Sequence, residues 1–283
     1  MRAEADAVHS TRRTFLGLMP MGIAVGAATV AAWPRSIVRA ADVDGPAGGA
    51  ISGHFPQQHP ELARRVVGAS HSNIDVVREL VEAQPALAKA AIDWGFGDWE
   101  TALGAASHTG RREIAELLLH HGARPNIFTH AMLGHLEVVK AIVAVRPEVV
   151  RLPGPHSITL YQHAQAGKDG AAEVRRFLEG LPDVPRTQPA QVLDESSHPI
   201  YEGAYVFDAG ADDRLIVAPG RQGLLQLRRG SDGTPRNLFC LGEHTFYPAG
   251  AEAVRVVFAV DDGRAQSVAI HDAEVVVVGQ REK

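Results

Sequence analysis

Two ten-residue segments in the middle of the chain resemble each other along their whole length. They are residues 110–119 and 134–143, and each begins with glycine and continues with apolar residues at helical spacing. Shorter copies occupy residues 73–81 and 171–178. A helical unit of this size cannot bury its apolar face alone, so at least three units must stack into one core. The repetition therefore predicts a helical repeat array over residues 60–181.

Glycine and apolar residues have separate roles in such an array. Gly110 and Gly134 stand where the chain reverses between two helices, and glycine adopts positive φ there without a steric penalty. The shared core is expected to include Leu117, Leu118, Val138, Val139 and Phe177.

Three short motifs relate this array to a known family. Residues 101–106, Thr-Ala-Leu-Gly-Ala-Ala, are similar to the Thr-Pro-Leu-His-x-Ala that begins the first helix of an ankyrin repeat. Residues 122–126, Gly-Ala-Arg-Pro-Asn, are similar to its closing Gly-Ala-Asp-Pro-Asn, and residues 134–135 match the turn between the paired helices. The segment thus resembles the ankyrin repeat family. The resemblance implies a concave surface of finger hairpins and inner helices that binds protein partners.

The array departs from the family pattern at two places. Gly104 and Gln162 stand where the family has its helix-start histidine. From Asn126 the chain passes almost directly to Met132, which shortens one finger by roughly eight residues. The resemblance therefore implies a degenerate array of three to four repeats with a non-standard groove.

The first forty residues have the features of an export signal. Arg12 and Arg13 are followed by Phe-Leu and a weakly apolar, glycine-rich run. This order resembles a twin-arginine signal peptide, which implies passage through the twin-arginine translocase. Small residues place the cleavage between Ala40 and Ala41, so the mature protein is expected to be periplasmic or secreted. The alternative is an uncleaved membrane anchor, the one case in which a membrane contact is expected.

The rest of the chain divides by composition and period. Residues 41–59 are rich in Gly, Pro and His and predict a flexible leader, whereas the four prolines of residues 182–199 predict an extended linker. Beyond residue 199 the apolar residues no longer recur at helical spacing and instead alternate along the chain. Eight short strands are expected at residues 204–208, 214–217, 224–227, 237–241, 244–247, 254–260, 267–271 and 274–278. Eight strands joined by tight turns within residues 200–283 predict a closed antiparallel barrel.

A second resemblance rests on fixed aromatics in this segment. Residues 201–205 read Tyr-x-Gly-x-Tyr, and the later matches are residues 224–227, 245–246, 256–258 and 262–263. The pattern is similar to a lipocalin-like domain appended to serine hydrolases of the penicillin-binding-protein type, where it is an accessory domain. Tyr205, Phe246 and Phe258 are expected to fill the barrel.

The sequence offers little evidence of catalysis. It contains no Ser-x-x-Lys, Gly-x-Ser-x-Gly, His-Glu-x-x-His or phosphate-loop motif. Its single cysteine, Cys240, reads as a small buried hydrophobe. Several histidines fall in the repeats, but none are paired at the i, i+4 spacing of two ligands on one helix face, so neither a metal nor another cofactor is expected. A nucleic-acid surface needs clustered positive charge, and with a net charge of −5 no nucleic-acid partner is expected.

The aromatic group of the first finger is the strongest candidate for a binding surface. Trp94 and Phe96 lie where ankyrin proteins expose residues to partners, and exposed tryptophan is typical of interface hot spots. Phe128, His156 and Tyr161 are weaker candidates, while Trp99 is expected to cap the core of the first repeat.

The expected fold is therefore multidomain, an α-helical ankyrin-repeat solenoid followed by a small antiparallel all-β barrel. The expected function is that of an exported, non-enzymatic protein that binds a periplasmic protein through its repeats. The alternative is a small-molecule-binding or hydrolase-associated protein that acts through the barrel.

Overall fold

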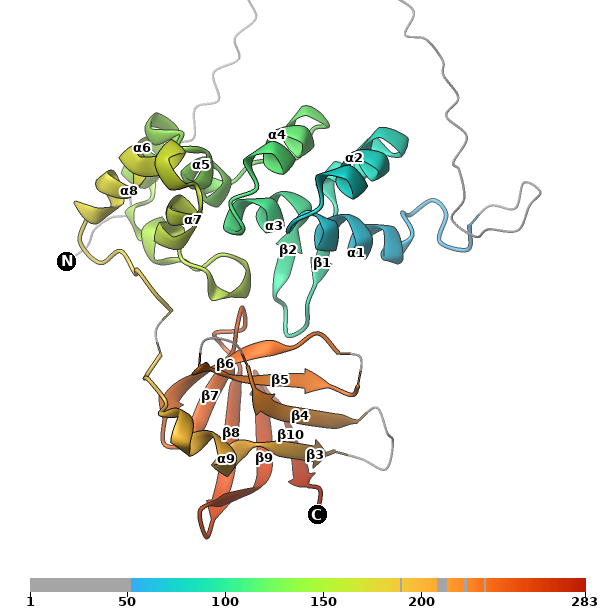
Figure 1. Cartoon of the computed structure of the whole chain (residues 1–283), viewed down its shortest axis with the longest axis vertical. Coiled ribbons are helices and arrows are strands. Elements are labelled where there is room, and N and C mark those ends of the chain that lie inside the picture. Colours follow the sequence, from blue (N-terminus) through green and yellow to red (C-terminus); the bar gives the residue numbers. More distant parts are fainter. Residues whose placement is uncertain (1–51, 189, 208–212, 221–222, 232) are drawn as a thin grey trace, which may run out of the picture. The chain divides into compact units, whose positions relative to one another are not determined.

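The computed structural model in Figure 1 describes residues 52–283 except 189, 208–212, 221–222 and 232. These residues belong to one compact unit. The predicted signal peptide, with Arg12, Arg13 and the cleavage site at Ala40 and Ala41, lies outside the described residues, as does most of the leader.

Four helix pairs follow one another from Pro60 to Glu179 (Figure 1). They are α1 (Pro60–Ala69) with α2 (Ile74–Ala83), α3 (Ala102–His108) with α4 (Arg112–His120), α5 (Ile127–Leu133) with α6 (Leu136–Val145), and α7 (Leu160–Ala166) with α8 (Ala172–Glu179). The first helices of the pairs contact one another in series, and α2 contacts α4 as α6 contacts α8. Among the residues that the structure describes, no helix combines the length and the apolar character needed to cross a bilayer.

Glycine permits the reversal between paired helices, as predicted. Gly110 and Gly134 have φ of 67° and 78°. A Cβ atom at Gly134 would overlap the carbonyl oxygen of Gly170, and one at Gly110 would overlap that of Ala166. Positive φ and close backbone approach therefore both require glycine at these turns.

The repeats bury two apolar clusters, one in the first two helix pairs and one in the last two. Leu118 and Val139 are fully buried, and Leu117 and Phe177 pack at the margins. The prediction was wrong for Val138, which is 39% exposed. Val138 points about 100° away from the buried Val139 around the helix and faces solvent there.

One finger is present and the next is missing. Strands β1 (Ala91–Asp93) and β2 (Trp99–Thr101) form an antiparallel hairpin between the first two helix pairs. No strand separates α4 from α5, because α5 begins directly after Asn126, whose side chain accepts a hydrogen bond from the Thr129 amide at 3.1 Å. The shortened finger was predicted.

The proline-rich segment ends in ordered structure that contacts the barrel. The Gln191 amide donates to the Cys240 carbonyl at 2.8 Å. A 3₁₀ turn, η5 (Glu195–Ser197), and one helical turn, α9 (His198–Tyr201), then lead into the first strand. The predicted linker is thus partly docked, because its backbone pairs with a strand instead of with water.

The C-terminal segment is a closed eight-stranded antiparallel barrel, as predicted (Figure 1). Its strands are β3 (Gly203–Val206), β4 (Arg214–Pro219), β5 (Leu225–Arg229), β6 (Arg236–Gly242), β7 (Thr245–Pro248), β8 (Arg255–Asp261), β9 (Arg264–Asp272) and β10 (Val275–Arg281). Each strand pairs with the next in sequence, and β10 closes the ring against β3. Closure removes the free edge that an open sheet of this size would expose.

Aromatic rings fill the inside of the barrel. Tyr205, Phe246 and Phe258 are buried, and the Phe258 ring lies 5.6 Å from that of Tyr205 and 5.5 Å from that of Phe246. Cys240 is a buried free thiol on β6, as expected of a small hydrophobe. The prediction that these three aromatics occupy the interior is confirmed.

Close backbone approach makes Gly134→Ala a severe substitution. Gly122 provides a matched control, since it also has positive φ, at 87°, but a Cβ there meets no atom within 4 Å. We expect Gly122→Ala to lower the free energy of unfolding by about 1–2 kcal/mol, the cost of a left-handed residue. Gly134→Ala should cost about 1–3 kcal/mol more, because the clash adds to it. Urea unfolding followed by circular dichroism compares them; equal costs would contradict the close packing.

Candidate functional site

The register of the finger hairpin decides which of its side chains are buried. Ile92 pairs with Glu100 and Asp93 pairs with Trp99. Side chains alternate along a strand, so Ile92 and Glu100 share the inner face while Trp99 points outward. Glu100 is accordingly 0% exposed and Trp99 is 65% exposed. The expectation that Trp99 caps the core was wrong.

The two aromatics predicted to contact a partner are partly buried instead. Trp94 packs on the first apolar cluster, and its indole nitrogen donates to Oε2 of Glu100 at 2.7 Å. Phe96 lies at the hairpin tip between Gly95 and Gly97, has φ of 56°, and packs at the margin of the barrel core. Both rings therefore have contacts within the chain.

The three weaker candidates differ in burial and in the groups that they contact. Phe128 is half-buried at the margin of the second apolar cluster, its ring 4.8 Å from that of His163. Tyr161 packs at the same cluster, its hydroxyl donates to Glu179 at 2.8 Å, and Arg186 covers its ring. His156 joins a group of titratable side chains around Glu100, with its ring 5.9 Å from that of Trp94.

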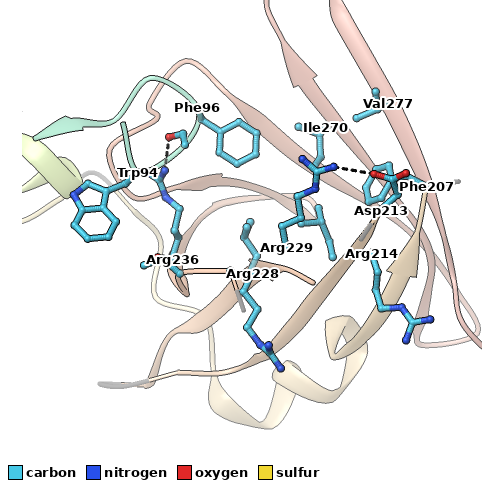
Figure 2. A pocket seen from close by; sticks show the side chains of 15 residues that line it. Trp94, Phe96, Phe207, Asp213, Arg214, Arg228, Arg229, Arg236, Ile270 and Val277 are labelled. Atoms are coloured by element: carbon cyan, nitrogen blue, oxygen red, sulfur yellow. Dashed lines mark hydrogen bonds and ion pairs between the residues drawn. The ribbon is translucent and has the colours of Figure 1, made fainter. Parts of the chain in front are cut away.

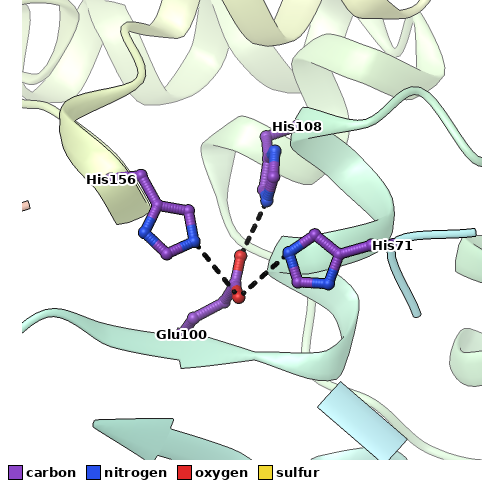
Figure 3. A group of neighbouring side chains, drawn as sticks. All are labelled: His71, Glu100, His108 and His156. Carbon is purple, nitrogen blue, oxygen red and sulfur yellow. Dashed lines mark hydrogen bonds and ion pairs between the residues drawn. The ribbon is translucent and has the colours of Figure 1, made fainter. Parts of the chain in front are cut away.

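Three imidazoles converge on the buried carboxylate of Glu100 (Figure 3). Nε2 of His108 lies 2.8 Å from Oε1 of Glu100. Nε2 of His71 and Nε2 of His156 each lie 3.4 Å from Oε2. One nitrogen or oxygen atom from each residue lies within 4.8 Å of the other three. We refer to these four residues, His71, Glu100, His108 and His156, as the His–Glu cluster.

The cluster takes its members from four segments of the array. His71 follows α1, Glu100 lies on β2, and His108 is the last residue of α3. His156 lies in η3 (Pro155–Ser157), the short turn ahead of α7, with φ of 59°. The turn packs close to Gly104, where an added Cβ atom would make ordinary van der Waals contact with Pro155 at 3.6 Å.

Asp98 fixes the orientation of His156. Its carboxylate accepts from the His156 amide at 3.0 Å and from Nδ1 of the same residue at 2.7 Å. Arg236 of strand β6 also contacts Asp98, with Nη2 3.0 Å from Oδ2. A left-handed conformation costs a non-glycine residue of order 1–3 kcal/mol, and these paired hydrogen bonds offset that cost at His156.

The groups of the cluster shift one another's protonation. Burial raises the pKa of Glu100, but hydrogen bonds from His108 and His156 outweigh it and hold this pKa well below its usual range. Burial lowers the pKa of His156, yet its bonds to Asp98 and Glu100 raise that pKa to about 9. For His108, burial prevails over the bond to Glu100 and lowers the pKa. At neutral pH the chain thus holds an ionised Glu100 beside a cationic His156 and a neutral His108.

The sequence predicted His156 as a partner contact, counted His108 only among the histidines of the repeats, and did not single out His71, Asp98 or Glu100. The signal that could have found Glu100 is the alternation of the short strand Trp99–Thr101, which places its middle residue on the buried face. A carboxylate is rarely buried unless it is paired. The histidines that pair it come from distant parts of the chain.

His163 is a separate buried histidine next to the cluster. It is 0% exposed, and neither ring nitrogen has a hydrogen-bond partner. Burial lowers the pKa of His163 to about 3. Its ring lies 6.3 Å from that of His108.

A cavity of about 540 Å³ lies beside the finger tip (Figure 2). Trp94 and Phe96 line it together with apolar residues of the barrel that include Leu215, Leu227 and Ile270. Asp213 and Arg229 form an ion pair of 2.8 Å at its edge. The wall is largely apolar, with charged groups at its margin.

The comparisons with known proteins agree with the first resemblance for one repeat. Residues 98–130 match the family model of the ankyrin repeat. The match covers Glu100 and His108 of the cluster, the exposed Trp99, and all of α3 and α4. No curated protein matches the chain. An ankyrin repeat indicates a module for protein–protein interaction, and here it is followed by the eight-stranded barrel.

His163 makes stability depend on pH. The folded protein excludes a proton that the unfolded chain binds at a pKa of about 6.5. Stability is therefore fully present above that pH and falls as the pH drops toward about 3, the folded-state pKa. Between pH 7 and pH 4.5 protonation of this histidine alone should lower the free energy of unfolding by about 2–3 kcal/mol. We expect the free energy of unfolding of His163→Leu to fall by that much less than the wild-type value between the two pH values. Urea titrations at both pH values measure this. The exposed His120→Gln should behave like wild type, and an unchanged pH dependence in His163→Leu would contradict the assignment.

Proposed function

We propose that this chain is an exported, non-enzymatic protein whose helical repeats bind a protein partner outside the cytoplasm. Four consecutive helix pairs support an ankyrin-type array longer than the matched repeat. The observation that carries the proposal is the exposed Trp99 on the finger of that repeat. Tryptophan is enriched among residues that dominate interface energies, and a monomer gains nothing from holding it 65% exposed.

The contact surface is the outer face of the finger. Trp99 and its strand neighbour Asp93 both point outward there. The side chains of Trp94 and Glu100 hold the hairpin from its inner face by a 2.7 Å hydrogen bond. A rigid hairpin loses little conformational freedom on binding, which favours affinity.

The N-terminal sequence supports export through the twin-arginine translocase to the periplasm or the exterior. That route carries folded proteins, and a chain with a single, buried cysteine needs no oxidising compartment to fold. Cleavage between Ala40 and Ala41 would leave no membrane anchor.

A second candidate function is binding of a small molecule at the barrel, in keeping with its similarity to the accessory domains of penicillin-binding-type hydrolases. The observation that favours it is the 540 Å³ cavity beside Phe96, which is of the size that small-molecule sites have. The buried Tyr205, Phe246 and Phe258 fill the barrel itself, so a ligand would lie at this cavity and not along the barrel axis.

Trp99→Ala tests the protein-binding proposal. Immobilised wild-type protein should retain one stoichiometric protein from a native periplasmic extract, and the variant should bind it about 30-fold more weakly, the effect of a hot spot of about 2 kcal/mol. Val145→Ala is the control, since Val145 is 81% exposed on α6 and lies outside the finger. Equal loss in both variants, or full retention by Trp99→Ala, would contradict a finger-centred interface.

Replacing both arginines of the signal tests export. Arg12→Lys with Arg13→Lys should leave the uncleaved chain in the cytoplasm, whereas wild type appears in the periplasm of a host with a twin-arginine translocase. Immunoblots of cell fractions measure this, with a translocase-deficient host as the control. Export of the double-lysine variant at wild-type levels would exclude this route.

A further inference from the structure

We propose that the His–Glu cluster binds one divalent transition-metal ion of the zinc class. Three imidazole nitrogens and one carboxylate oxygen form a donor set that zinc accepts, usually in four-coordinate tetrahedral geometry. This binding site is independent of the outward-facing finger surface proposed above.

The distances suit such an ion. With bonds of about 2.0–2.1 Å, the ligand atoms of a tetrahedral zinc site are about 3.3 Å apart. Nε2 of His71 and Nε2 of His156 each lie 3.4 Å from Oε2 of Glu100. With all four donors within 4.8 Å of one another, small side-chain rotations complete the tetrahedron.

Two of the histidines are already oriented as metal ligands. Nδ1 of His71 lies 3.1 Å from the carbonyl oxygen of Gly68 and 3.2 Å from that of Val67, so it carries the proton that these acceptors require. Nδ1 of His156 donates to Asp98 at 2.7 Å. In both rings this leaves Nε2 to face Glu100. A carboxylate or carbonyl behind the distal nitrogen is the usual support of a metal-bound histidine.

An ion pair alone does not account for this arrangement. His156 already contacts both carboxylates, with Nδ1 2.7 Å from Oδ2 of Asp98 and Nε2 3.4 Å from Oε2 of Glu100. His71 and His108 bring two more Nε2 atoms to the oxygens of Glu100. A single metal ion coordinates all three nitrogens and the carboxylate at once.

The cluster is reachable from two cavities. One of about 320 Å³ is lined by His71, Trp94 and His156, and one of about 430 Å³ is lined by His108 and His156. Polar side chains contribute to the lining of both cavities, and Asn237 lines each of them. An ion can therefore enter without unfolding of the repeats.

The test is titration of the full, chelator-treated chain with zinc chloride by isothermal calorimetry, followed by cobalt(II) substitution. We expect one zinc per chain and the intense visible absorption of four-coordinate cobalt. His108→Ala and Glu100→Gln should lose both signals. The double variant His130→Ala with His135→Ala is the matched control, since the Nδ1 atoms of these two histidines lie 3.0 Å apart at the surface and are not part of the cluster. It should bind as wild type does.

Asp98→Asn distinguishes a weakened metal site from loss of binding through misfolding. Asp98 supports His156 without being a ligand, and removing such support lowers metal affinity by about 10–100-fold while leaving a stoichiometry of one. Circular dichroism confirms that each variant is folded. The proposal is overturned if wild type binds no zinc, if the surface double variant alone abolishes binding, or if folded His108→Ala binds zinc as tightly as wild type.

Discussion

The buried carboxylate of Glu100 is the constraint around which the first half of the chain is arranged. An isolated carboxylate in this position would cost several kcal/mol, so the fold must bring hydrogen-bond donors to it. The indole of Trp94 and the imidazoles of His108 and His156 are these donors, and Nε2 of His71 lies 3.4 Å from the same carboxylate. Removing any one donor would leave the buried charge with fewer partners. The cluster thus links the turn after α1, the finger, the end of α3 and the turn before α7.

Glycine makes the surrounding repeats possible. Gly110 and Gly134 turn the chain between paired helices and let neighbouring backbones approach closely. Asp98 extends the same network to Arg236 of the barrel. A finger held from behind in this way can present Trp99 to a partner as a rigid projection, which connects the buried polar centre to the proposed binding surface.

Much of the fold was predictable from sequence because it depends on the spacing of apolar residues and on the residues that form the turns. The paired helices, the missing finger after Asn126 and the closed barrel with its aromatic interior follow from spacing, glycine positions and alternation. The site was less predictable. Trp99 was expected to cap the core because tryptophan is apolar, and a strand of three residues is too short to show its alternation in the sequence. His71 and His156 are 85 residues apart, so only the tertiary structure brings them together.

The central claim is that the His–Glu cluster forms a metal centre. Diffraction from crystals of the full chain grown with equimolar zinc, recorded on both sides of the zinc absorption edge, tests it most directly. The account predicts a single strong anomalous peak between Oε2 of Glu100 and the Nε2 atoms of His71, His108 and His156. Density for direct histidine–carboxylate contacts in the cluster, with anomalous signal only at surface histidines such as His130, would contradict it.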